Sequence, residues 1–520
     1  IYTTQDPAIQ LICDEEYENP DNFPSGTQVT LDYRLTVKHP NGEQENYSKE
    51  MLSLYFQNED PEFDLLFDSQ EEAQAYVDRY KQSVLADGSK VVAERVNFAP
   101  QPQSSMSVID QHTGYVKAIV GGRGEKTASL TLNRATDTTR QPGSTFKVVS
   151  TYAPALNEKG MTLATTFEDE PYNYPDGSPV ENASRTYGGT TTIRRAIQNS
   201  INVVAVKCLE EVTPELGLQY LDNFGFTTLA HGTEADTDAN GTVWTDANLP
   251  LALGGLTHGV TNVELCAAYA AIANQGNYIE PLYYTKILDH NGNVLIEKTS
   301  AERSVIKEST AWLLTSAMED VVKSGTGTAC QLDNMTVAGK TGTTDDYNDL
   351  WFVGYTPYYT CAVWSGFDNN EKLPDDYSRD FHKDMWRKVM TRIHEGLEDK
   401  DFEMPSTVEK ISVCADTGLL PRSGCSVITE FFDVGDVPTD YCEEHFYEPE
   451  PVIPEYTYDE TIIPEPSLTP ENPDENGDQG DGNTDNGDAG GEGNGGDDTG
   501  SGDTGGGDTG DGDTGGGDVG

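Results

Sequence analysis

Positive charge is what this sequence has least of. Its 520 residues hold 33 Lys+Arg against 89 Asp+Glu, a formal net charge of −56. Residues 471–520 contain fifteen of the acids and no Lys or Arg, yet the remaining 470 residues still carry −41. Binding to nucleic-acid phosphates requires a surplus of Lys and Arg, and so does a polybasic membrane anchor. Both are therefore excluded, and the acidity suits a soluble protein outside the cell or at its surface.

Long apolar runs are absent as well. No stretch of eighteen apolar residues occurs, so we expect no transmembrane helix in this chain. The chain opens at Ile1 with neither Met nor a signal peptide, and we expect it to be a fragment of a longer or processed protein. None of its eight histidines lies in a paired catalytic motif, and no G-x-S-x-G elbow is present.

Composition divides the length into four regions. Residues 1–99 are polar and carry no obvious chemistry, and we expect a linker or accessory module that ends at Pro100. Residues 100–400 form the main predicted domain, and 401–447 form an extension with three cysteines. Residues 448–520 are first rich in Pro and Glu and then in Gly and Asp, which predicts a stiff spacer and a disordered tail.

The main region alternates between the two regular structures in a particular order. Strand patterns lie at both of its ends, and helical patterns lie between them. This order favours an α+β domain in which helices cover one sheet, rather than an alternating parallel fold. We expect strands within 106–120, 335–344, 350–355 and 359–365, and helices over 144–158, about 190–211, 262–274 and 311–322.

The first chemical motif is Ser144-Thr145-Phe146-Lys147. Residues three apart on a helix share one face, and Pro142-Gly143 places Ser144 at the predicted helix start, where backbone N–H groups favour a developing anion. A serine needs a base to become a nucleophile, and a lysine with a lowered pKa can be that base. Taken alone, the motif equally describes a capping serine beside a surface lysine.

Two further motifs follow in order. Ser200-Ile201-Asn202 places a hydroxyl and an amide two residues apart, so that both can face one cleft. In Lys340-Thr341-Gly342-Thr343-Thr344 a cation and hydroxyls flank a glycine on a predicted strand, which suits a carboxylate. A phosphate loop is the rival interpretation of this stretch, but Asn334 occupies the position of its first glycine. Each motif alone also fits ordinary polar surface.

Together the three motifs are typical of serine/lysine acyl transfer. The chain resembles the transpeptidase region of class A (bifunctional) penicillin-binding proteins, within the penicilloyl-serine transferase superfamily. The resemblance extends to Thr3–Pro7, to the approach segment from Asn133 to Ser144, and to the segments 324–329 and 349–357 around the third motif. It implies an α/β/α sandwich whose mainly antiparallel sheet is covered by helices on both faces.

The resemblance also implies a role for each motif residue. Ser144 would attack the carbonyl between two D-alanines of a stem peptide, Lys147 would accept its proton, Ser200 would relay that proton, and Asn202 would hold the substrate amide. Lys340 completes the catalytic set, and substrate would bind along Thr341, Gly342, Thr343 and Thr344. The backbone N–H groups of Ser144 and Thr343 would form the oxyanion hole.

The partners implied are peptidoglycan stem peptides, as D-Ala-D-Ala donor and amine acceptor, and β-lactam antibiotics. No cofactor and no nucleic acid is expected. The resemblance implies an extracellular location at the bacterial membrane and cell wall, with a membrane anchor and a glycosyltransferase domain in segments outside this chain. Two alternatives stay open: a D,D-carboxypeptidase or β-lactamase, and a non-catalytic sensor of β-lactams or muropeptides.

The cysteines allow two interpretations. Cys442-Glu443-Glu444-His445 has a spacing found in metal ligands, and with Cys414 and Cys425 it would make a Cys₃His zinc set. The ten residues between Cys414 and Cys425 lack the tight knuckle of a structural zinc site, so we predict an extracellular Cys414–Cys425 disulfide and no metal. The other five cysteines are expected to be buried free thiols, and His258 is expected to be structural or on the surface.

Overall fold

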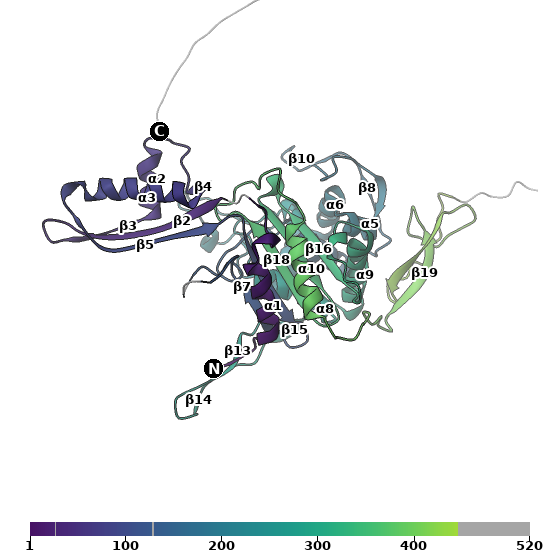
Figure 1. Ribbon diagram of the computed structural model, residues 1–520. Helices are drawn as coiled ribbons and strands as arrows, with labels where there is room; N and C mark the ends of the chain where they lie inside the picture. The colour runs from purple at the N-terminus through teal and green to yellow at the C-terminus, as the bar shows by residue number, and fades with distance from the viewer. Residues whose placement is uncertain (26–27, 127–128, 130, 446–520) are drawn as a thin grey trace, which may run out of the picture. The chain divides into compact units, whose positions relative to one another are not determined.

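The structure is a computed structural model that describes residues 1–25, 28–126, 129 and 131–445 (Figure 1). These residues belong to one compact unit. The predicted spacer and disordered tail at 448–520 lie outside the described residues. No helix in the described ranges is both long enough and apolar enough to span a membrane.

A five-stranded antiparallel sheet forms the centre of the main region. Its strand order is β16-β17-β18-β6-β7. The first strand of the region therefore pairs with the last one, across the helical segments that separate them in sequence. The predicted mainly antiparallel sheet is confirmed. Its strands are β6 (Gln103–Asp110), β7 (Tyr115–Val120), β16 (Ala338–Thr343), β17 (Asp349–Tyr355) and β18 (Thr360–Gly366).

Helices cover both faces of this sheet (Figure 1). Successive strand residues point to opposite faces, so Trp351 and Phe352 of β17 belong to two different hydrophobic cores. The predicted α/β/α sandwich is thereby confirmed. One face packs against α8 (Asn262–Ala273) and α9 (Glu308–Ser324), and the other against α1 (Pro7–Glu18) and α10 (Phe381–Ile393).

The start of the chain contributes to this domain. Asp6 caps α1 by accepting hydrogen bonds from the N–H groups of Ala8 and Ile9, and Cys13 and Tyr17 are buried in the same core as α10. Residues 28–100 have a core of their own. It is built from β2 (Val29–Lys38), β3 (Gln44–Ser48), α2 (Lys49–Gln57), β4 (Leu66–Phe67), α3 (Gln70–Val84) and β5 (Lys90–Pro100).

Two predicted helices differ from expectation at the motifs. The helix expected at 144–158 begins as a 3₁₀ turn (Gly143–Thr145), continues as a π-helix (Lys147–Tyr152) and ends as α4 (Ala153–Glu158). The helix expected at 190–211 is divided into α5 (Ile193–Asn199) and α6 (Asn202–Val212). Irregular helical turns of this kind frequently occur at functional sites.

The extension forms an antiparallel hairpin of β19 (Val408–Cys414) and β20 (Val427–Asp433). All eight cysteines lie among the described residues, and all are free thiols. The prediction is confirmed for the five buried ones at 13, 208, 266, 330 and 361. The structure does not contain the predicted Cys414–Cys425 disulfide: both cysteines are free thiols, and their sulfurs lie within 4.8 Å of Cys442 Sγ and of a His445 ring nitrogen.

Candidate active site

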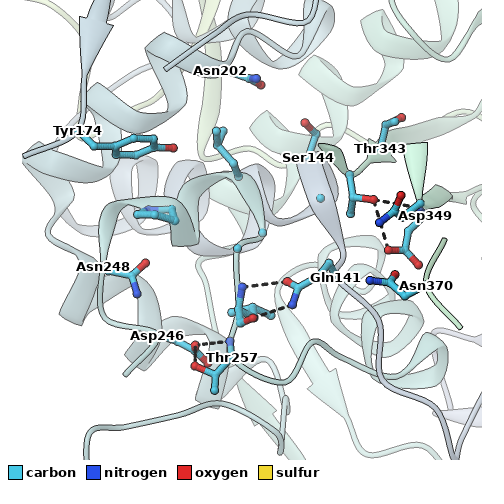
Figure 2. Close-up of a pocket in the computed structure, with 18 of the residues that line it drawn as sticks. Gln141, Ser144, Tyr174, Asn202, Asp246, Asn248, Thr257, Thr343, Asp349 and Asn370 are labelled. Carbon is cyan, nitrogen blue, oxygen red and sulfur yellow. Dashed lines mark hydrogen bonds between the residues drawn. The ribbon is translucent and has the colours of Figure 1, made fainter. Parts of the chain in front are cut away.

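A cleft of about 520 Å³ opens where the edge strand β16 meets the 3₁₀ turn that carries Ser144. Ser144, Asn202, Thr343 and Thr344 line it, so the cleft brings the three motifs together. Figure 2 shows Ser144 beside Thr343, with Asn202 and Tyr174 in the same cleft. The residues that form its walls also include Gln141, Gly143, Trp244, Asp246, Asn248, Gly254, Leu256, Thr257, Asp349 and Asn370.

Two buried lysines meet at one hydroxyl behind this cleft. Lys147 Nζ and Lys340 Nζ donate to Ser200 Oγ over 3.2 Å and 2.8 Å. Lys147 also donates to the Ser200 carbonyl oxygen at 2.6 Å and to Asn202 Oδ1 at 2.5 Å. Among the described residues, no hydrogen bond joins Ser144 to either lysine. Ser200 is thus the group through which the two lysine amines are connected.

Burial lowers the pKa of both lysines. Lys147 and Lys340 are fully buried. Burial, followed by the neighbouring Lys340 charge, holds the pKa of Lys147 well below its usual value. Burial alone lowers the pKa of Lys340 to about 7. A neutral amine can accept a proton and a charged one can bind an anion, so this pair can supply both functions near neutral pH.

The strained backbone at Ser200 positions this residue to bond Lys147. Ser200 has φ +56°, in the left-handed region, between α5 and α6. In this conformation both its carbonyl oxygen and its hydroxyl accept from Lys147. Such strain costs about 1–3 kcal/mol and persists only when surrounding contacts impose it.

Two residues that the sequence analysis missed hold Asn202 in place. Asn182 Oδ1 accepts from the N–H of Asn202 at 2.9 Å, and Asn182 Nδ2 donates to buried Asp169 at 2.7 Å. Asn202 Nδ2 in turn donates to the Glu181 carbonyl oxygen at 2.7 Å. These partners lie in a loop that carries no motif, so no pattern in the sequence indicated them.

Three glycines bring the Ser144 turn close to its neighbours. A Cβ atom on Gly143 would lie 3.0 Å from Thr343 N, and one on Gly342 would lie 2.6 Å from Pro142 O. A Cβ atom on Gly254, which has φ +80°, would lie 2.5 Å from Gly143 O. The turn before the serine is therefore in backbone contact with β16 on one side and with the segment at Gly254 on the other. Gly254 was not among the predicted site residues.

The approach to Ser144 is held by side chains that bond to backbone. Gln141 donates to the Leu256 carbonyl oxygen at 2.6 Å and accepts from the Leu256 N–H at 2.9 Å. Arg140 donates to the Phe367 carbonyl oxygen at 2.6 Å and stacks over the Trp364 ring. These contacts hold residues 140–141 between the backbone at Leu256 and the backbone at Phe367.

The threonines of the third motif differ in their surroundings. Thr343 is exposed in the cleft, whereas Thr341 Oγ1 bonds Thr326 Oγ1 at 2.7 Å. Thr344 Oγ1 accepts from the Asp349 N–H at 2.9 Å and so shapes the turn after β16. Gly342 lies in β16 between them. His258 is exposed and is not among the cleft residues, in line with a surface position.

Comparison with family models identifies two matched regions. Residues 105–391 match the penicillin binding protein transpeptidase domain, and residues 404–447 match the C-terminal domain of penicillin-binding protein 1A. The first match covers more than half of the chain and contains all three motifs.

Curated relatives and solved structures agree with these matches. The chain is 34% identical to penicillin-binding protein 1A of Clostridium botulinum over 382 residues, which is 70% of this chain and 44% of that protein. It is 30% identical to penicillin-binding protein 1A/1B of Bacillus subtilis over 66% of this chain and 38% of that protein. The chain thus spans less than half the length of these relatives.

The fold matches that of penicillin-binding protein 1A from Haemophilus influenzae, with a TM-score of 0.59, 19% identity, and coverage of 84% of this chain and 73% of that one. It also matches the PonA1 protein from Mycobacterium tuberculosis, solved in complex with penicillin V. That TM-score is 0.51, at 25% identity, covering 59% of this chain and 82% of that one.

Proposed function

Because the chain belongs to the family of penicillin-binding protein transpeptidase domains, we propose that it cross-links peptidoglycan stem peptides through an acyl-enzyme on Ser144. The observation that carries this proposal is the pair of buried lysines joined at Ser200 Oγ beside a cleft lined by Ser144. The pair supplies a base and an anion receptor next to a candidate nucleophile.

In the first step Ser144 Oγ attacks the carbonyl carbon between the last two D-alanines. Neutral Lys147 accepts the serine proton when substrate has closed the site, and Ser200 passes it to the departing D-alanine amine. The C–N bond breaks and an ester forms on Ser144. Charged Lys340, with Thr341 and Thr343, binds the terminal carboxylate, and Gly342 leaves room for the peptide along β16.

The anion that develops on the carbonyl oxygen needs donors in fixed positions. We assign this role to the N–H groups of Ser144 and Thr343. The close approach of the Gly143 backbone to Thr343 supports the assignment, because it brings the two peptide segments side by side. One such donor contributes about 3–4 kcal/mol to lowering the barrier in other acyl-transfer enzymes.

In the second step an amine of a neighbouring stem peptide attacks the ester and completes the cross-link. β-Lactams would acylate Ser144 by the same first step. The two carboxylates that line the cleft do not favour hydrolysis. Asp246 accepts from Ala230 and Thr257, and Asp349 accepts from the Trp364 indole and lies 4.0 Å from Arg140. Both are engaged in structural bonds, so neither is poised to activate water.

A stem-pentapeptide donor tests this function directly. We expect D-alanine release that depends on added amine acceptor, together with a long-lived penicillin adduct, because the ester is protected from water. The measurement is mass spectrometry of products with and without acceptor. Rapid turnover of a chromogenic β-lactam would instead indicate the hydrolase, and a stable adduct without any amine-dependent product would indicate the sensor.

Gly254→Ala tests the close contact behind Ser144. The new Cβ would press on the Gly143 backbone, so we expect the rate of penicillin acylation to fall about 100-fold, as ångström-scale misplacement of a reacting group does. Gly396→Ala is the matched control. Its φ of +82° imposes the same strain, but nothing lies within 4 Å of its Cβ position. Equal acylation rates in the two variants would contradict this role of Gly254.

For the whole protein, we propose an extracellular enzyme held at the bacterial membrane, with a glycosyltransferase domain in its remaining length. The support is the family membership together with the greater length of the relatives. The coding sequence upstream of Ile1 tests this proposal.

A further inference from the structure

The C-terminal hairpin gathers four metal-ligating side chains at one end. Cys414 is the last residue of β19, Cys425 precedes β20, and Cys442 and His445 follow the hairpin. The three sulfurs and one imidazole nitrogen all lie within 4.8 Å of one another. This cluster is separate from the cleft, since none of its members is among the cleft residues.

Backbone hydrogen bonds hold the segments that carry these side chains. The Cys414 N–H donates to the Leu419 carbonyl oxygen at 2.8 Å, which closes a tight turn after β19. The Arg422 N–H donates to Cys425 Sγ at 3.3 Å. The Cys442 N–H donates to the Leu420 carbonyl oxygen at 2.8 Å and so brings the third cysteine to the same turn. The knuckle that the sequence spacing seemed to lack is thus supplied by folding of the intervening residues.

The two sulfur-to-nitrogen distances at His445 match those of a tetrahedral metal site. His445 Nδ1 lies 3.3 Å from Cys442 Sγ and 3.5 Å from Cys414 Sγ. With Zn–S of about 2.3 Å and Zn–N of about 2.0–2.1 Å, tetrahedral geometry separates sulfur from nitrogen by about 3.6 Å. A disulfide would use two of the three thiols and leave the third thiol and the imidazole unexplained. A tetrahedral ion uses all four.

A carboxylate-to-histidine contact agrees with this arrangement. His445 Nε2 lies 3.5 Å from Asp416 Oδ2, on the side of the ring away from the sulfurs. Histidines that ligate a metal through one nitrogen usually present the other to a carboxylate, which fixes the orientation of the ring. Asp416 is in position for that role.

The hairpin has little apolar core to stabilise it. Among the described residues, its own cluster contains only Val413 and Phe432 of the hairpin with Ala164 of the main domain, packed by Ile411 and Val437, while Val408 and Phe431 pack into the main core. Small modules with so few buried apolar residues usually require a metal or disulfides. In the described residues the hairpin has no disulfide, so a metal ion would be its main cross-link.

We propose that Cys414, Cys425, Cys442 and His445 bind one structural Zn²⁺. The donor set, three thiolates and an imidazole, is typical of zinc, and four protein ligands leave no open position for catalysis. The hairpin also contacts the main domain, through Glu430 to Arg194 and through Phe431 against Trp312. The ion therefore orders a module that packs on α5 and α9.

Metal analysis of the full chain, purified without chelator, tests the proposal. We expect one zinc per chain and eight titratable thiols after denaturation in chelator. Cys425→Ser and His445→Gln should each lower bound zinc more than about 10-fold. The matched control Cys208→Ala removes a buried thiol outside the cluster and should retain the zinc. Zinc-free protein with six free thiols would overturn the proposal, as would undiminished zinc in the two ligand variants.

Cobalt substitution of the wild-type chain keeps the test independent of whether the variants fold. Co²⁺ should produce the thiolate-to-metal charge-transfer band and the intense visible bands of a tetrahedral thiolate site, and Zn²⁺ should displace it. Octahedral cobalt spectra would contradict the site. Because none of the four cluster residues lines the cleft of Ser144, penicillin labelling reports separately on the proposed function.

Discussion

Ser144→Ala is expected to abolish the covalent penicillin adduct. In serine proteases, which also act through a serine acyl-enzyme, loss of the nucleophile lowers turnover by about 10⁶-fold, because the remaining groups have no atom to acylate. Alanine removes one oxygen from a half-buried position, so the fold should persist. The measurement is intact mass after incubation with penicillin, with the thermal midpoint recorded in parallel.

Two results would contradict this expectation. One is an adduct of full stoichiometry in the Ser144→Ala protein. The other is peptide mapping that places the wild-type adduct on Ser200, the second serine near the lysines. Ser184→Ala serves as the control and should leave labelling unchanged, since among the described residues this exposed serine hydrogen-bonds only to Thr186 of its own loop.

The site could be predicted where short spacing combines with distinctive chemistry. The Ser-x-x-Lys, Ser-x-Asn and Lys-Thr-Gly patterns each place side chains within one turn or along one strand, so their order carried the prediction. The residues that were missed act through long-range backbone contacts. Gly254 abuts the Gly143 backbone, and Asn182 caps the helix of Asn202, and neither contact follows from local sequence.

The fold, like the site, could be predicted where the local sequence pattern is strong. Buried strands such as β17 and the alanine-rich α8 have strong local patterns, and both occur as expected. The π-helix at Lys147 and the division of the helix expected over about 190–211 at Ser200 were not predicted as such, because tertiary contacts with the buried lysines outweigh local helix preference there. The approach of Cys442 and His445 to Cys414 and Cys425 was not predicted, because it depends on the long-range backbone contact of Cys442 with Leu420 and not on local spacing.

The acidity of the chain takes on a different meaning once the site is known. The chain carries a net charge of −56, yet the two ionisable groups that donate to Ser200 Oγ are both lysines. Under the proposed function, a substrate with a terminal carboxylate would meet charged Lys340 within an otherwise anionic protein. The net negative charge argues against nucleic acid as a partner. The proposed ligand is instead indicated by the lysines beside Ser200.

Lys147→Met is expected to slow acylation by about 10²–10⁴-fold, the usual contribution of a general base. Methionine keeps the length and fills the buried space without an amine. The loss should appear in the acylation rate, whereas binding of a non-acylating carboxylate should persist through Lys340. Stopped-flow labelling with a fluorescent penicillin measures the acylation rate, and competition with a D-alanyl peptide measures carboxylate binding.

The pH dependence separates the two lysines. Protonated Lys147 cannot act as a base, so the second-order acylation rate should fall as pH drops through its lowered pKa. Neutral Lys340 cannot pair with a carboxylate, so the rate should also fall as pH rises above about 7. Lys340→Arg keeps its charge and should remove the alkaline limb, while Lys147→Met should remove the acid limb. An acid limb that survives in Lys147→Met would assign the base to another group, because the free-enzyme profile reports the groups that must hold or lack a proton.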